Sequence, residues 1–353
     1  MNNYGKLRTL FGIIACVSYL TLTGCEDNRT NPDQTPFVGS VLLVANYADG
    51  AGNMSSIELE SGAIIHHAAG LGNSPNDMIE FDNRIFVLNS LSNNMNILRL
   101  MDNNTLEEDT VIELGNGNPM NGAIAGNGFL YISNGVDDEV TVYDTYRSRL
   151  LAYLPVGKSP ADVIVTNGNV YVCNTGLVDN GYEPGTLSVI PISSGLVEGT
   201  ISVGTNPQYM ATDPDGRLHV VCSGNYGIYT PEIEGEINII NTMADTVESY
   251  IYIGGQPREI VITENGFAYV TAGGWEDEGY VFRYNAFTGQ ILNGPDNPIV
   301  VGLGAWGIAA DDDGTVYVGC WTADAVYKII GDEVVDVINQ VGDAPGPMLI
   351  YRK

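Results

Sequence analysis

The chain has 353 residues, of which 43 are Asp or Glu and 14 are Lys or Arg, so its formal net charge at pH 7 is −29. Such a field repels phosphate backbones, which excludes nucleic-acid binding and favours neutral or cationic partners. The length is sufficient for a sizeable buried core.

The N-terminus has the features of an export signal. Two basic residues precede an apolar run over 10–22, and the sequence LTGC follows at 22–25. This pattern predicts a signal peptide over 1–24, because the apolar run is too short for a good membrane-spanning helix. The small residues before Cys25 resemble the bacterial lipobox, and the resemblance implies cleavage that leaves Cys25 as a lipid-bearing first residue. The alternative is an ordinary signal in which Cys25 is incidental.

The next segment differs in composition from the remainder. Residues 26–36, EDNRTNPDQTP, are polar and contain proline, which is typical of a flexible tether. We therefore expect an acidic tether over 25–37, lipidated at Cys25, and a folded domain over 38–353. A lipid anchor predicts attachment to the bacterial outer membrane, on its surface or its periplasmic side.

The folded domain is built from an internal repeat. Its clearest copy is VGKSPADVIVTNGNVYVCN at 156–174, which joins a Gly-x-x-Pro corner, an apolar run, an Asn-Gly turn and a Tyr-Val strand. The corner recurs at 71–75, 114–119, 203–207, 253–257 and 341–345, and a seventh copy at 301–305 has Ala305 in place of proline. Repetition at roughly 40–50 residues is the signature of a repeat architecture.

Each repeat contains four strand-like runs. Between one Tyr-Val strand and the next corner lie two further runs, such as VTVYD at 140–144 and LAYLPV at 151–156. Alternation of apolar and polar residues, bounded by Gly, Asn, Asp and Pro, indicates β-strands, and the Asn-Gly and Asp-Gly pairs predict hairpins. Seven four-stranded antiparallel units predict an all-β fold, a seven-bladed β-propeller.

The two ends of the repeat series complement each other. The first unit, which begins with LLVAN at 42–46, has no proline-led inner strand ahead of it. The last unit is followed by a surplus inner strand, PMLIYRK at 347–353. We therefore predict that the C-terminal strand pairs into the first blade and closes the ring, which removes exposed sheet edges.

The repeated strand also resembles a known family. YVCN at 171–174 and YISN at 131–134 are similar to the motif of the YVTN-repeat propellers, the YncE-like family. The resemblance covers nearly all of 38–353 and implies a seven-bladed propeller. It implies no particular function, because this scaffold supports many unrelated roles.

One face of the propeller is predicted to carry the site. The corners and the loops after the Tyr-Val strands share this face, and the loops over 175–185, 223–235 and 273–279 are long. Variable loops on a rigid scaffold often carry function. The candidate ligand-binding residues on this face are Tyr182, Tyr209, Tyr226, Tyr229, Arg258, Trp275, Trp306 and Trp321. The alternative is that these rings only pack the loops against one another.

Catalysis has little support in the sequence, and no catalytic residue is assigned. His66 and His67 fall on an outer strand, and His219 occupies a position where other repeats have Tyr or Phe. No G-x-S-x-G nucleophile motif occurs. We therefore expect no enzymatic activity.

Metal and cofactor sites are not predicted either. The mature chain keeps Cys173, Cys222 and Cys320, which lie at the ends of Tyr-Val strands with no C-x-x-C spacing and are expected to be buried. Runs of acids at 137–139, 276–278 and 311–313 could hold Ca²⁺, but solvated loop charge is the simpler interpretation.

These observations predict a secreted, lipid-anchored, non-enzymatic propeller that acts as a binding or scaffold protein. Its partner would be a small ligand or an envelope protein held on the loop face of blades 4–6, and the propeller is expected to be monomeric. One branch of similar propeller lipoproteins captures vitamin B12-type corrinoids for an outer-membrane transporter, which is one alternative. A lactonase-like or lyase-like propeller enzyme and a purely structural envelope protein are the others.

Overall fold

The computed structural model describes residues 39–48, 50–115, 117–226, 231–273 and 278–352. Within these ranges the secondary structure consists of strands, with no helix. Accordingly, the described residues contain no helix of the length and hydropathy needed to cross a membrane.

The strands form seven antiparallel blades. From its inner to its outer strand, blade 1 is β31 (Pro345–Arg352), β1 (Ser40–Asn46), β2 (Asn53–Glu58) and β3 (Ile64–Gly70). In the same order, blade 2 is β4 (Pro75–Phe81), β5 (Arg84–Asn89), β6 (Asn94–Leu100) and β7 (Leu106–Glu113). Blade 3 is β8 (Pro119–Ile124), β9 (Phe129–Asn134), β10 (Glu139–Asp144) and β11 (Arg149–Pro155).

Two of the remaining blades carry additions. Blade 4 is β12 (Pro160–Thr166), β13 (Asn169–Asn174), β16 (Thr186–Pro191) and β17 (Gly199–Ser202), with a hairpin of β14 (Leu177–Val178) and β15 (Gly181–Tyr182). Blade 5 is β18 (Pro207–Thr212), β19 (Leu218–Cys222), β20 (Glu236–Asn241) and β21 (Thr246–Ile251). Blade 6 is β22 (Pro257–Ile262), β23 (Phe267–Ala272), β24 (Gly279–Asn285), β25 (Ile291–Asn293) and β26 (Ile299–Val301). Blade 7 is β27 (Ala305–Ala310), β28 (Val316–Cys320), β29 (Ala325–Ile330) and β30 (Glu333–Asn339).

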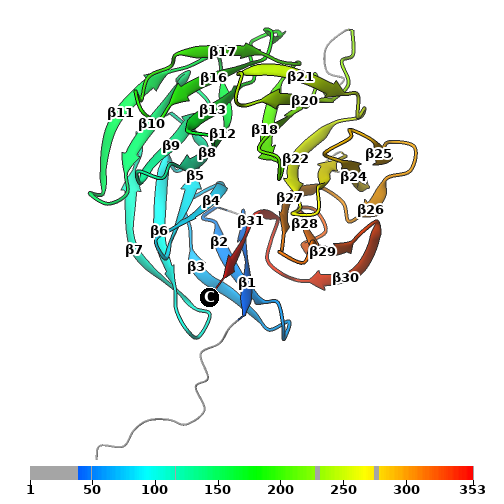
Figure 1. Ribbon diagram of the computed structural model, residues 1–353. Helices are drawn as coiled ribbons and strands as arrows, with labels where there is room; N and C mark the ends of the chain where they lie inside the picture. Colours follow the sequence, from blue (N-terminus) through cyan, green and yellow to red (C-terminus); the bar gives the residue numbers. More distant parts are fainter. Residues whose placement is uncertain (1–38, 49, 116, 227–230, 274–277, 353) are drawn as a thin grey trace, which may run out of the picture. The chain divides into compact units, whose positions relative to one another are not determined.

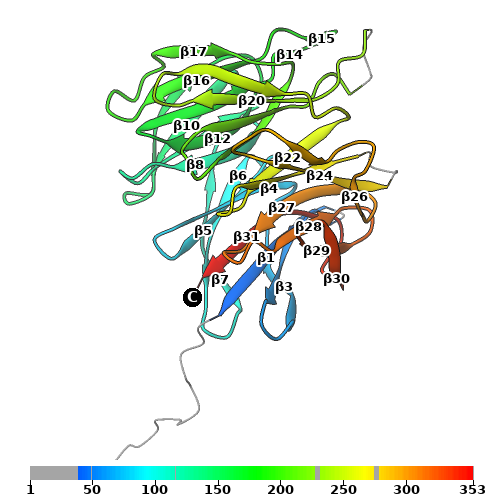
Figure 2. The same cartoon turned by 45° about the vertical axis from the view of Figure 1, so that its right-hand side comes forward.

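The blades stand side by side in a ring (Figures 1 and 2). Each inner strand contacts the inner strands of both neighbouring blades, so the series β4, β8, β12, β18, β22, β27 and β31 returns to its start. The chain is a seven-bladed β-propeller, as the sequence predicts. In blade 6, however, the outer edge is shared by two short strands, β25 and β26, which both pair with β24.

Burial explains the sequence pattern of the strands. The second strand of each blade packs against blades on both sides, so β13 is buried along most of its length and reads as a continuous apolar run. The outer strand β11 has one face in solvent, and its exposure alternates from residue to residue. The core lies between blades: Tyr131 of blade 3, for example, packs in one cluster with Val163 and Val172 of blade 4.

The Gly-x-x-Pro corner is explained by close packing against the strand-end asparagine. A side chain at Gly157 would bring a Cβ to 2.5 Å from Cγ of Asn174, and one at Gly72 would come within 2.7 Å of Asn89. Asn174 is buried and donates to Thr186 and to Ser188 of the next strand. The glycine therefore leaves room for an amide that links the strand to its outer neighbour.

The predicted hairpins form at the opposite face, which we call the turn face. Asn167 and Gly168 both have positive φ, at 47° and 80°, as a two-residue type I′ turn requires. In the Asp215-Gly216 pair only the glycine has positive φ, at 82°, which fits a longer hairpin ending in a left-handed glycine. The face that carries the corners is called the corner face.

The predicted ring closure is confirmed. β31 pairs with β1 in antiparallel register, with Val41 opposite Tyr351 and Leu43 opposite Leu349. The strand begins at Pro345, two residues earlier than the sequence suggested. Since Ser40 lies opposite Arg352, the chain enters blade 1 from the turn face.

Candidate functional site

The inner strands contain bulges near the corner face. Pairing between β12 and β13 shifts register between Pro160 and Val163, and the other inner strands have similar shifts just after their corners. A bulge re-aims the side chains at its position. We call the residue directly after each corner a member of the first ring, and the next residue a member of the second ring.

The two rings have different compositions. The first ring is the residue directly after each corner: Asn76, Met120, Ala161, Gln208, Arg258, Trp306 and Gly346. The second ring is the next residue: Asp77, Asn121, Asp162, Tyr209, Glu259, Gly307 and Pro347.

Aromatic residues gather around Arg258 at the first ring. The Cζ of Arg258 lies 5.0 Å from the ring centroid of Trp306 and 6.0 Å from that of Tyr226. The ring centroids of Trp306 and Trp321 lie 6.3 Å apart, and those of Trp321 and Tyr47 lie 4.2 Å apart. We call these five residues the mouth cluster; all of them are partly exposed. They bring blades 5, 6, 7 and 1 to one place.

Small residues make room for this cluster. A Cβ on Gly346 would come to 2.4 Å from the Tyr47 ring, so the glycine allows that ring to lie over β31. The Tyr47 hydroxyl then donates to Asn76 at 3.0 Å, and the Asn76 amide donates to the Met120 carbonyl at 3.4 Å. The ring of Tyr47 is thus fixed across the mouth by a polar contact with blade 2.

The second ring contains three carboxylates in alternate blades. Asp77 accepts a hydrogen bond from the Gly122 amide at 2.9 Å, and Asp162 accepts one from the Met210 amide at 2.7 Å. Glu259 accepts one from the amide of Ile308. In every case the donor belongs to the inner strand of the next blade, so the carboxylates link blades 2, 4 and 6 to their neighbours.

These carboxylates resist ionisation. Burial raises the pKa of Asp77 to about 6. Burial, together with the negative charge of Asp77, raises the pKa of Asp162 to about 8. The pKa of Glu259 is raised well above its usual value by burial and by the charges of both aspartates. Acids whose pKa values are raised by burial and by neighbouring like charges are a feature of functional sites.

Tyr209 interacts electrostatically with both kinds of charge. Burial raises the pKa of its hydroxyl, the charge of Glu259 raises it further, and Arg258 acts in the opposite direction. The tyrosine is therefore close to both the carboxylate ring and the mouth cluster.

The predicted site residues fall into three groups. Tyr226, Arg258, Trp306 and Trp321 meet in the mouth cluster, and Tyr209 lies in the second ring. Tyr182 belongs to the β14–β15 hairpin and lines a different cavity of about 430 Å³ together with Asn225 and Pro231. Tyr229 and Trp275 lie outside the described residues.

Four residues of the site were not anticipated: Tyr47, Asp77, Asp162 and Glu259. Tyr47 follows its strand as Trp321 follows the equivalent strand of blade 7, so alignment of the repeats carries this signal. The three acids share one offset after the corner, which is also visible in the sequence.

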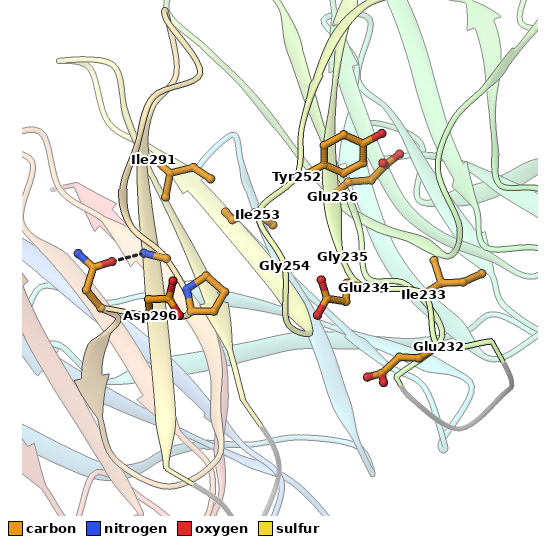
Figure 3. A pocket seen from close by; sticks show the side chains of 13 residues that line it. Glu232, Ile233, Glu234, Gly235, Glu236, Tyr252, Ile253, Gly254, Ile291 and Asp296 are labelled. Atoms are coloured by element: carbon orange, nitrogen blue, oxygen red, sulfur yellow. Dashed lines mark hydrogen bonds between the residues drawn. The ribbon is translucent and has the colours of Figure 1, made fainter.

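A further cavity of about 790 Å³ lies at the junction of blades 5 and 6 (Figure 3). Glu234, Glu236 and Tyr252 line it from blade 5, and Ile291 and Asp296 line it from blade 6. It contains no residue of the mouth cluster. Its lining contains several acids and no cation, whereas the mouth combines a cation with aromatic rings, so we favour the mouth as the candidate site.

The histidines, the cysteines and one run of acids have structural environments. His66 and His67 are exposed on β3, whereas His219 is buried, with Nδ1 2.8 Å from the Tyr284 hydroxyl. Cys173, Cys222 and Cys320 are free and buried, as expected. Asp311 accepts hydrogen bonds from the amides of Asp313 and Thr315 within its hairpin. Within the described ranges, no three His, Cys, Asp or Glu side chains form a group able to hold a metal ion.

Comparison with known proteins supports the fold and goes no further. No family model and no curated protein matches the chain. A candidate 6-phosphogluconolactonase from Bacteroides fragilis is similar in structure, with a TM-score of 0.71 and 11% identity over 90% of this chain and 99% of that one. Apo AztD from Citrobacter koseri has a TM-score of 0.57 and 11% identity, covering 89% and 98%. Hydrazine synthase from Kuenenia stuttgartiensis has a TM-score of 0.62 and 16% identity, covering 79% and 96%.

Proposed function

We propose that this protein is a non-enzymatic, lipid-anchored binding protein whose ligand is held over the channel mouth. The observation that supports this most is the mouth cluster, in which Arg258 is stacked between aromatic rings from neighbouring blades. A guanidinium held in this way offers pre-positioned donors, and the partly exposed rings offer apolar surface. Such a combination is common at the centres of binding sites.

The sequence predicts a site on the long loops of blades 4 to 6. The mouth cluster instead favours a site about one blade further along the ring. The long loops of blades 4 to 6 supply Tyr226, but Trp306, Trp321 and Tyr47 come from blades 7 and 1. We therefore centre the proposed site on the mouth rather than on the loop tips.

We also propose that Cys25 carries a lipid anchor, as the sequence LTGC at 22–25 predicts. Changing Cys25→Ser should move the protein from the detergent phase to the aqueous phase. Equal aqueous recovery of both forms would contradict lipidation.

The binding site is tested with a ligand screen and two variants. Thermal-shift measurements of the mature protein against corrinoids, glycans, peptides and small charged metabolites would identify a ligand. Trp306→Ala and Arg258→Ala should each weaken its binding by ~1–3 kcal/mol in calorimetry. Asn167→Ser on the turn face, which removes hydrogen bonds to Gly216 and Thr242, should lower stability without changing affinity. A ligand that binds both mouth variants normally would refute the proposed site.

A further inference from the structure

Three cavities adjoin one another at the corners of blades 4, 5 and 6. The cavity of about 430 Å³ beside the β14–β15 hairpin and the cavity of about 790 Å³ between blades 5 and 6 share Ile233 in their linings. The larger cavity shares Pro295 with a third one, of about 570 Å³, which Tyr280 and Phe282 of β24 line. We call the three together the corner groove. Each volume lies in the range of cavities that bind ligands.

The charged residues that line the corner groove all have the same sign. Within the described residues, the three linings contain no Lys, Arg or His. Glu234 of blade 5 and Asp296 of blade 6 approach the largest cavity from opposite sides (Figure 3). The acids of the groove are Glu183, Glu232, Glu234, Glu236, Glu278 and Asp296.

These acids have neutral partners inside the protein. Glu236 accepts a hydrogen bond from the Asn238 amide at 2.7 Å, and Glu278 accepts one from the Tyr280 hydroxyl at 3.4 Å. Among the ion pairs formed in the described part of the chain, none involves an acid of the groove. A cationic group that enters the groove therefore meets carboxylates without displacing an internal cation, which is electrostatic complementarity to a basic partner.

Exposed apolar and aromatic side chains lie beside the acids. Tyr252, which lines the largest cavity, is 71% exposed, and its ring centroid lies 5.0 Å from that of Tyr250. Ile233, at the junction of two cavities, is 42% exposed. Lys and Arg side chains suit such a surface, because their aliphatic stems pack on apolar groups while their charged ends reach carboxylates or an aromatic face.

We propose that the corner groove docks an extended segment of a partner polypeptide in which Lys or Arg residues alternate with apolar ones. A polypeptide fits the groove better than a small amine does, because the cavities extend over three blades and each combines acids with apolar lining. The groove lies next to the mouth, since Gln256 donates to the Tyr226 carbonyl at 3.3 Å, but no residue of the mouth cluster lines it. The inference therefore adds a second binding surface to the proposed function.

The test begins with a selection that assumes no sequence. Random dodecapeptides displayed on phage are selected on the immobilised mature protein. The retained sequences should contain Lys and Arg about twofold or more above their frequency in the library, together with aromatic or aliphatic residues. Because the whole protein is acidic, this enrichment alone does not locate the binding site, and the tightest peptide is then synthesised for titration by fluorescence anisotropy.

Paired variants locate the binding site at constant net charge. Glu234→Gln combined with Asp296→Asn should weaken binding of the selected peptide by about fivefold or more, and less at high salt. Glu264→Gln combined with Asp313→Asn is the matched control, because it removes the same charge from exposed turn-face positions. It should change affinity by less than about twofold.

An aromatic pair of variants tests the apolar part of the groove. Tyr252→Ala should weaken peptide binding by about tenfold, as expected for an exposed aromatic side chain that a partner buries. Tyr153→Ala on β11, which is also half exposed but lies outside the groove, should bind as the native protein does.

Several outcomes would overturn the proposal. These are a selection that retains no peptide, retained peptides without excess Lys or Arg, and equal weakening by the groove and turn-face variants. Spermidine that loses affinity in the groove variants, while the selected peptide does not compete with it, would indicate a small amine instead. If Arg258→Ala weakens peptide binding and the groove variants do not, the peptide is a ligand of the mouth, so this inference fails and the proposed function stands.

Discussion

Asp213 and Asp162 are both buried, yet they lie at opposite ends of the propeller and titrate in opposite directions. At the turn face, burial alone would raise the pKa of Asp213, but hydrogen bonds from His219 and Arg217 lower it to about 2. At the corner face, burial and the neighbouring Asp77 raise the pKa of Asp162 to about 8. The difference is the counter-charge: the Arg217 guanidinium lies 2.7 Å from Asp213, whereas Asp162 forms no ion pair within the described residues and accepts the amides of Val163 and Met210.

This contrast separates two uses of a buried acid. Asp213 belongs to a satisfied network in which its carboxylate also accepts the amides of Asp215 and Arg217, and its role is structural. The acids of the second ring instead have raised pKa values, because burial disfavours their charged forms. Raised pKa values of this kind are more frequent at functional sites than elsewhere.

The largest expected effect comes from opening the ring, which disturbs both regions together. Deleting 345–352 removes β31, whose Met348, Ile350 and Tyr351 are buried. The free energy of unfolding should fall by about 5 kcal/mol or more, since several apolar side chains lose their contacts. Chemical denaturation measures the loss, and an unchanged midpoint would show that blade 1 does not need its inner strand.

The next effect tests the compensated acid. Asp213→Ala removes the partner of Arg217 and of His219 and should destabilise the protein by about 3 kcal/mol in urea titrations. Asp215→Ala, two residues away and exposed, should change stability by less than about 0.5 kcal/mol. Similar losses in both variants would mean that the turn, and not the ion pair, matters.

A smaller loss of stability, which depends on pH, is expected when Asp162 is replaced, because this acid has no ion-pair partner within the described residues. Asp162→Ala leaves the Met210 amide without its acceptor and should cost about 1–3 kcal/mol, whereas Asp162→Asn keeps an acceptor and should cost less than about 1 kcal/mol at pH 7. The folded protein holds the Asp162 proton up to about pH 8, while the unfolded chain releases it near its ordinary pKa. Native stability should therefore fall as pH rises from about 4 to 8.

The asparagine variant isolates that contribution. It lacks the titrating group, so its stability should decline less over the same pH range than that of the native protein. Asp213 behaves in the opposite sense, because its lowered pKa gives stability that is lost only as pH falls from about 4 towards 2. Superimposable pH profiles for the native protein and Asp162→Asn would remove the contrast between the two acids.

The smallest effect is expected where a counter-charge exists but is exposed. Arg352 pairs with Asp312 near the turn face, and both side chains are more than half exposed, at 58% and 69%. Arg352→Ala should cost less than about 1 kcal/mol, and the difference should vanish in high salt. A larger loss would show that the pair contributes to ring closure.

The fold could be predicted because its information is repeated. Seven corners and seven Tyr-Val strands agree with one another, so the strands can be predicted even where one copy is ambiguous. The missing inner strand of the first unit and the surplus strand after the last unit predict the ring closure. The outer edge of blade 6 departed from the prediction because the segment 286–301 forms two short strands, β25 and β26, where one run had been expected.

The candidate site was only partly predictable. The sequence pointed to Trp306, Trp321 and Arg258 because they interrupt the repeat with unusual residues. Asp77 and Asp162 were missed because polar residues are ordinary near strand starts, and only the structure shows that each accepts an amide from the inner strand of the next blade. Tyr182 was placed on the correct face, but its loop folds into a separate hairpin, which no spacing rule revealed.

The pairing of β31 with β1 has a consequence for how the chain is assembled. Val41 and its partner Tyr351 are separated by nearly the whole domain, so this contact forms across a very long loop and is expected late in folding. Until then β1 presents an open edge to other molecules. A β31 strand from a second copy can fill the same place with the same register, which makes exchange of this strand the expected route to dimers when the protein refolds at high concentration.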